Sequence, residues 1–173
     1  MHKVAKFSKV SFEQFKEGMS DFGLAGSKVG ELKLREIYDN ITLPKRATTG
    51  SAGYDFRTPV SFMLQPGETI KFPTGIRCEM FEDWVLMIFP RSGLGFKYRL
   101  QLNNTVGVID SDYYYSDNEG HIFAKITNDS NEGKVVSLNE GDAFAQGVFL
   151  PYGITVDDDA TGTRNGGFGS TGK

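Results

Sequence analysis

Short apolar segments rich in β-formers follow one another along most of the chain. Gly, Pro, Asn and Asp separate them, and the segments are 34–42, 60–65, 68–72, 84–89, 100–109, 121–128, 134–138 and 143–150. This spacing predicts an all-β barrel or sandwich. Apart from a turn at 92–100, no helix of ten or more residues is predicted after residue 35. A parallel sheet with a Rossmann or P-loop nucleotide site is therefore not expected.

The opening residues lack this pattern. Ser11 precedes an amphipathic stretch and Gln14 follows three residues later, which is the capping-box signature of a helix start. Phe12, Phe15 and Met19 would share one face of this short helix, and residues 21–31 read as a loop. We expect an N-terminal extension (1–30) that packs against a β domain (31–161), followed by a glycine-rich tail (162–173).

Composition agrees with short strands and tight turns. The chain has 21 glycines among 173 residues, against a usual glycine share of about 7%. Aromatic residues make up 13% and hydrophobic residues 39%, which argues against disorder. The length suits one main domain.

Charge and cysteine content narrow the function classes. With 22 acidic and 19 basic residues, the net charge is -3, so no stable nucleic-acid partner is expected, although a small anionic substrate remains possible. Cys78 is the single cysteine, which excludes a disulfide within the chain and a Cys-rich zinc site. No run of about 18 apolar residues predicts a membrane span. The start has no signal-peptide core, so a cytoplasmic protein is expected.

Two alternatives stay open for the tail, which has five glycines in residues 162–173. It is either a flexible terminus or a strap that closes over a ligand. Arg164, Phe168, Ser170 and Thr171 favour the strap, because they offer a cation, a stacking ring and hydroxyl groups among residues that allow close backbone approach.

Four further clusters contain candidate chemistry. Asp55 lies between two aromatic residues and is either a turn residue or one of several acids. Arg91, Ser92 and Gly93 follow an apolar strand and offer groups that suit phosphate oxygens. These signals are weak one by one.

The third and fourth clusters lie within segments that are mostly apolar. Asp110 follows Val108 and Ile109 and is either a general base for water or the cap of its own hairpin turn. Asp110 and Asp112 alternate, so on an extended strand they would face the same way. Gln146 lies among apolar neighbours and needs a hydrogen-bonding partner, from the backbone or from a ligand.

Taken in order, five segments resemble the motifs of the trimeric, all-β dUTPase (dUTP nucleotidohydrolase) family. They are SAGYDF, PRSGL, GVIDSDY, GDAFAQ and RNGGFGSTG, and the resemblance covers about residues 41–173. It implies a dUTPase-like β-barrel or jelly roll (β-clip) with a short N-terminal helix and a glycine-rich C-terminal arm. It also implies a homotrimer whose sites draw on three subunits and which hydrolyses dUTP to dUMP and pyrophosphate.

The resemblance also implies roles for the third motif. Asp110 would activate the water that attacks the α-phosphorus, and the Tyr113 ring would lie under the deoxyribose and leave no room for a 2′-hydroxyl. Uracil would be read by Asn104 and by the backbone of residues 106–109, which includes Gly107, Val108 and Ile109.

The other motifs are implied to bind the triphosphate and Mg²⁺. Mg²⁺ would be held indirectly, through phosphates and waters, with support from Asp55. Arg164 would bind the γ-phosphate and Phe168 would stack on uracil. The remaining residues implied to contact substrate are Arg91, Ser92, Gly93, Gln146, Gly169, Ser170, Thr171 and Gly172.

The chain departs from the family pattern in two places. Ala143 replaces an arginine of the fourth motif, and residues 114–120 lengthen the hairpin after Tyr113, where they are expected to reshape the rim of the site. A dCTP deaminase is a poorer match, since the strand at 121–128 has no acid before Asp129 and the fifth motif is present. A non-catalytic nucleotide sensor on the same fold remains an alternative, although Asp110 and the tail are both retained.

Overall fold

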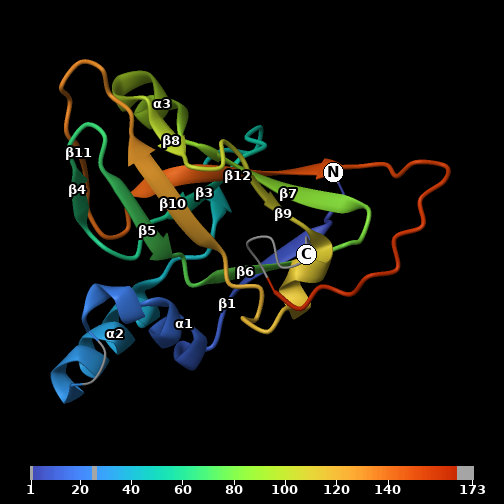
Figure 1. The fold of residues 1–173 in the computed structure, drawn as a ribbon, viewed down its shortest axis with the longest axis horizontal. Coiled ribbons are helices and arrows are strands. Elements are labelled where there is room, and N and C mark those ends of the chain that lie inside the picture. Colours follow the sequence, from blue (N-terminus) through green and yellow to red (C-terminus); the bar gives the residue numbers. More distant parts are fainter. Residues whose placement is uncertain (1, 25–26, 167–173) are drawn as a thin grey trace.

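The computed structural model describes residues 2–24 and 27–166, and strands dominate it (Figure 1). The strands in chain order are β1 (Ala5–Lys9), β2 (Lys45–Arg46), β3 (Tyr54–Arg57), β4 (Phe62–Leu64), β5 (Thr69–Pro73), β6 (Ile76–Met80), β7 (Trp84–Pro90), β8 (Leu100–Leu102), β9 (Gly107–Ile109), β10 (Phe123–Asn128), β11 (Val136–Leu138) and β12 (Ala143–Pro151). The helices are α1 (Phe12–Gly18), η1 (Ser20–Phe22), α2 (Lys28–Asn40), α3 (Ser92–Tyr98) and η2 (Ser111–Tyr115). The predicted all-β fold is confirmed.

Two antiparallel sheets enclose the main core. One has the strand order β2-β3-β12-β7-β9 and the other the order β5-β10-β8, while β11-β4 and β1-β6 form separate pairs. Phe72 on β5 and Phe144 on β12 are both fully buried, and their ring centroids lie 5.0 Å apart. Because apolar side chains alternate inward on both sheets, the space between the sheets is lined from both sides.

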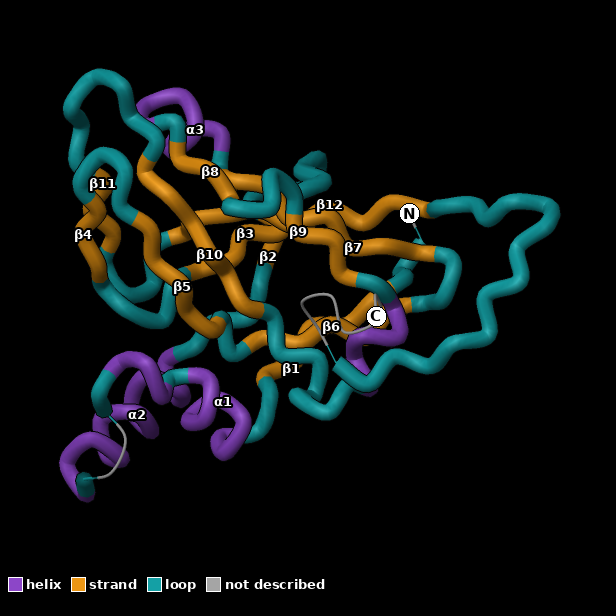
Figure 2. The backbone as a smooth tube through the Cα atoms, in the orientation of Figure 1, coloured by secondary structure: helices purple, strands orange, loops and turns teal. Residues whose placement is uncertain are grey.

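The helices α1 and α2 lie together beside one end of the sheets (Figure 2). They bury a second, smaller core of Val10, Phe12, Phe15, Met19, Leu34 and Ile37. The predicted start of α1 is confirmed, since the Ser11 hydroxyl accepts the Gln14 N–H at 3.1 Å. In a full capping box the Gln14 side chain would also accept the Ser11 N–H. Here the Ser11 N–H donates to the Glu119 carboxylate at 2.7 Å instead.

The predicted strand at 34–42 is wrong, because helix α2 occupies most of it. Gly30, Leu34 and Ile37 are its buried residues, a spacing of three and four that fits a helix and not the alternation of a strand. The Ser27 hydroxyl accepts the Gly30 N–H at 3.0 Å and caps the first turn. The loop predicted at 21–31 therefore ends at Ser27, and α2 crosses the expected boundary at residue 30.

Strands β1 and β6 were not predicted. They pair with each other over five residues, with Phe7 opposite Cys78, and Phe7 packs its ring on Phe56 at 5.6 Å. The first strand thus covers the edge of the main core. Within the described ranges, no helix is long and apolar enough to cross a bilayer.

Candidate active site

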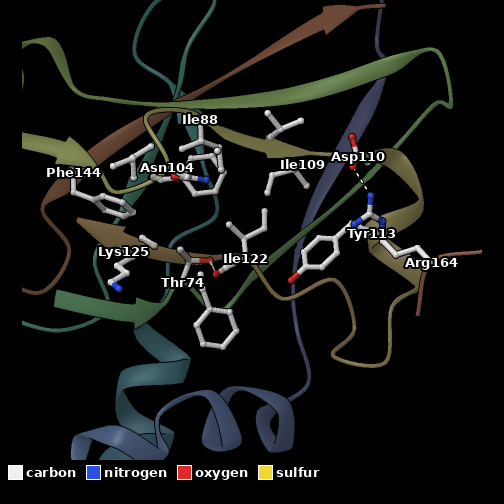
Figure 3. Close-up of a pocket in the computed structure, with 16 residues that line it drawn as sticks. Thr74, Ile88, Asn104, Ile109, Asp110, Tyr113, Ile122, Lys125, Phe144 and Arg164 are labelled. Atoms are coloured by element: carbon white, nitrogen blue, oxygen red, sulfur yellow. Dashed lines mark hydrogen bonds and ion pairs between the residues drawn. The ribbon is translucent and has the colours of Figure 1, made fainter. Parts of the chain in front are cut away.

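A cavity of about 270 Å³ opens between the two larger sheets. Strands β3, β7, β9 and β12 line it from one side and β8 and β10 from the other, and the third motif forms much of its wall. Figure 3 shows Asp110, Tyr113 and Arg164 at one end of the cavity, with Asn104 and Phe144 toward the other. Its size is close to the lower end of small-ligand pockets.

The third motif enters the cavity as strand β9. Gly107 pairs with Ile88 of β7, and a Cβ at position 107 would lie 3.2 Å from the Cβ of Ile88, so glycine allows this close approach. In the preceding loop Thr105 has a φ of 68°, and its N–H donates to the Leu102 carbonyl at 2.8 Å. This tight turn places Asn104 and residues 107–110 on the cavity wall.

Asp110 ends this strand and is bound by an arginine from the tail. Arg164 donates to the Asp110 carboxylate at 2.5 Å and to the Asp112 carboxylate at 2.8 Å. Only 18% of the Arg164 side chain is exposed. Asp110 and Asp112 do face one partner, but not through the expected strand alternation. Asp110 directly precedes η2, without a side-chain capping hydrogen bond, and Asp112 lies in the first turn of η2.

Tyr113 is buried beside these carboxylates, with only 7% of its surface exposed. Its hydroxyl donates to the His121 carbonyl at 2.7 Å and accepts from the Asn118 amide at 2.8 Å. Burial raises the pKa of the Tyr113 phenol, and the Asn118 hydrogen bond and the charge of Arg164 offset part of that effect. The phenol therefore stays neutral and is held from two sides.

A second cluster combines the first, second and fourth motifs. Gln146 on β12 lies opposite Asp55 on β3, and the Asp55 carboxylate faces Arg91 at 3.5 Å. A Cβ at Gly53 would lie only 2.7 Å from Gln146 Oε1, so a larger residue there would require the end of the glutamine side chain to shift. Ser92 opens α3, and Gly93 follows it.

The chain does not bring these two clusters into one site. Asp55 and Gln146 lie outside the cavity lining, whereas Phe56, next to Asp55, and Phe144 belong to it. Phe144 lies two residues before Gln146, at an irregularity in the strand pairing between Ala143 and Ala145. Because side chains alternate across a strand, Asp55 lies on the other face of the sheet from Phe56. Residues Phe168, Gly169, Ser170, Thr171 and Gly172 lie outside the described residues.

That other face also carries apolar side chains, including that of Val108, which alternates with Gly107 and Ile109 along β9 although the residue also belongs to the cavity lining. Val148, Met87 and Val108 follow one another across β12, β7 and β9, and 54% of Val108 is exposed.

Sequence reasoning missed the contacts that the inserted residues make with the site. It assigned 114–120 to the rim, yet Asn118 binds the Tyr113 hydroxyl and Glu119 binds Ser11 of the N-terminal segment. The only signal in the sequence was the added length of the hairpin. Length alone does not say where a loop folds back.

The comparisons agree with this geometry. The dUTPase family model matches residues 39–172. The deoxyuridine 5′-triphosphate nucleotidohydrolase of Lactococcus lactis is 42% identical over 135 residues, which is 76% of this chain and 89% of that protein. The corresponding protein of Hahella chejuensis is 40% identical over 148 residues, covering 80% of this chain and 91% of its own length.

Solved structures give the same result. The dUTPase of Streptococcus mutans is 41% identical, with a TM-score of 0.58 over 67% of this chain and 89% of that chain. A Staphylococcus bacteriophage 80alpha dUTPase with dUPNHPP shares the fold at 18% identity, with a TM-score of 0.63 over 99% of this chain and 100% of that chain. With the five motifs in order and most of its length matched, the chain belongs to the dUTPase family.

Proposed function

We propose that this enzyme hydrolyses dUTP to dUMP and pyrophosphate by general-base catalysis at Asp110. The observation that supports this most directly is the position of the carboxylate, at the end of β9 on the rim of the cavity and beside the buried Tyr113. A water oxygen would attack the α-phosphorus while Asp110 accepts the water proton. The bond from that phosphorus to the bridging oxygen breaks, and pyrophosphate leaves.

The cavity would hold the nucleoside. Uracil would lie between the two sheets, where Asn104 and residues 107–109 line the cavity and would face its polar edge. The Tyr113 ring would form the floor under the deoxyribose, where a 2′-hydroxyl would meet it. The close packing of Gly107 on Ile88 leaves this wall little freedom to retreat from a bulkier base.

Arg164 would change partners during the reaction. Without nucleotide its guanidinium is paired with Asp110 and Asp112, so an oxygen of the proposed base is occupied by this ion pair. A γ-phosphate offers a guanidinium a bidentate, charge-assisted alternative to the two carboxylates. Triphosphate binding would therefore draw Arg164 away and free the Asp110 carboxylate for water.

A homotrimer would complete the site. Arg91, Asp55 and Gln146 are the phosphate-directed groups, and they lie across the sheet from the chain's own cavity, so a neighbouring subunit would have to supply them. The row of exposed Val108 and partly exposed Met87 and Val148 offers apolar surface for a subunit contact.

Mg²⁺ would enter with the substrate. The described residues contain no group of three or more His, Cys, Asp or Glu that could hold a metal ion, so phosphate oxygens and waters would supply most ligands. Asp55 has the oxygen chemistry that Mg²⁺ prefers and would support those waters. When bound, Mg²⁺ neutralises charge that develops on the leaving pyrophosphate.

Pyrophosphate release from dUTP in the presence of Mg²⁺ tests the proposal, with dCTP, dTTP and UTP as competing substrates. Asp110→Asn should lower kcat by about 10²- to 10⁴-fold and retain binding of a non-hydrolysable dUTP analogue, measured by calorimetry. Asp117→Asn makes the same change at an exposed position and should leave kcat unchanged. Near-normal turnover in Asp110→Asn would remove Asp110 from the mechanism.

A further inference from the structure

The inserted residues 114–120 curl around the hydroxyl group of Tyr113. The Asn118 side-chain Nδ2 donates to that hydroxyl at 2.8 Å, and the Asn118 side-chain Oδ1 accepts the Gly120 N–H at 3.2 Å. Gly120 has a φ of +69°, and a Cβ there would lie 2.7 Å from the Tyr113 carbonyl. The turn therefore closes tightly enough to keep the Asn118 amide on the phenol.

The insert is fixed at both ends from outside. At its end, Glu119 accepts the Ser11 N–H at 2.7 Å and the Ser11 hydroxyl at 2.6 Å. At its start, Arg77 donates to the Tyr114 carbonyl at 2.7 Å and lies 3.7 Å over the Tyr114 ring. Helix α1 and strand β6 thus clamp the segment that carries Asn118.

This arrangement holds the Tyr113 hydroxyl from two sides. The His121 carbonyl accepts its proton at 2.7 Å, and Asn118 occupies one of its lone pairs. Because its hydroxyl is held by these two hydrogen bonds, the Tyr113 ring cannot tilt away from a 2′-hydroxyl that contacts its face. With one of the two contacts removed, the ring gains freedom to make space.

We propose that Asn118 is a positioning residue that fixes the Tyr113 ring and thereby sets the discrimination between 2′-deoxyribose and ribose. The inference rests on the proposed function, since it assigns the ring to the sugar of dUTP. It gives the insert a role in specificity, and it gives helix α1 a connection to the site through Ser11 and Glu119.

A double-mutant cycle with Asn118→Asp and Tyr113→Phe tests this. Aspartate keeps the acceptor for the Gly120 N–H but cannot donate to the phenol, which then has one proton for two acceptors. The ratio of kcat/KM for dUTP to that for UTP should fall about 3- to 10-fold, the range expected for one buried hydrogen bond. In the Tyr113→Phe background the same substitution should cause no further fall.

Asn118→Ala should lower the ratio similarly, and Asp117→Asn, next to it but exposed, should not. The ratio of the binding affinities for dUMP and UMP, measured by calorimetry, tests the same discrimination between deoxyribose and ribose without turnover. An unchanged ratio in both Asn118 variants, or an equal fall with and without the Tyr113 hydroxyl, would overturn the positioning role. A wild-type protein that neither hydrolyses dUTP nor binds dUMP would instead overturn the proposed function.

Discussion

His121 should make the protein less stable as the pH falls from 6.5 to 4. The side chain is completely buried, and its ring lies 4.6 Å from the Phe123 ring. Its Nε2 accepts the Gly75 N–H at 3.0 Å, so the ring proton is on Nδ1, which has no hydrogen-bond partner among the described residues. Burial lowers the pKa of His121 to about 4, and the nearby Glu119 carboxylate offsets this only in part.

The direction and size of this change in stability follow from the difference in proton binding between the folded and unfolded chain. Below pH 6.5 the unfolded chain protonates this histidine, whereas the folded chain keeps it neutral until about pH 4. The free energy of unfolding therefore falls by up to about 1.4 kcal/mol per pH unit in this window, or about 3 kcal/mol in all. Above pH 6.5 both states are neutral at this residue, and its contribution is constant.

Urea unfolding at a series of pH values between 4 and 7.5 measures this effect. His121→Gln can keep an acceptor for the Gly75 N–H but cannot titrate, so its stability should fall less steeply than that of the wild type. His2→Gln alters the other, exposed histidine and should leave the wild-type slope unchanged. All proteins need the same concentration, because subunit association contributes to apparent stability. Equal slopes for wild type and His121→Gln would refute the reasoning.

Three other outcomes are expected. Arg164→Gln should lower kcat/KM for dUTP about 10- to 150-fold, the range for lost charge-assisted hydrogen bonds, and steady-state kinetics that match the wild type would contradict this. Gly147→Ala should reduce the free energy of unfolding by about 1–3 kcal/mol, because its Cβ would lie 2.8 Å from side-chain atoms of Leu86 and Phe56; Gly153→Ala, with nothing within 4 Å, is the control in the same urea titration. Light scattering at concentrations that support activity should return a trimer, and a monomer there would exclude sites shared between subunits.

Much of the fold could be predicted because strand signals are local. The segment around Trp84–Pro90 is continuously apolar and became β7, an interior strand of the five-stranded sheet. Helix α2 was missed because its β-branched and aromatic residues resemble a strand, and only the positions buried at helical spacing, such as Leu34 and Ile37, distinguish it. Strand β1 was missed because its sequence, AKFSK, is mostly polar and its partner β6 lies about 70 residues away.

The site was predicted in its residues but not in its contacts. The motif order identified Asp110 and Tyr113, since these positions belong to contiguous segments. The pairing of Arg164 with Asp110 spans 54 residues, and the bond from Ser11 to Glu119 spans 108. Such contacts depend on how the whole chain folds, so no local pattern contains them.

The placement of the two motif clusters on opposite faces of one sheet has a genetic consequence. If neighbouring subunits complete each site, a chain with a defective Asp110 still carries a sound Arg91, and a chain with a defective Arg91 still carries a sound Asp110. Mixed trimers of two inactive chains would then contain a site built from the intact half of each. A cell that expresses both inactive variants would therefore recover some enzyme activity, whereas a cell that expresses only one of them would have none.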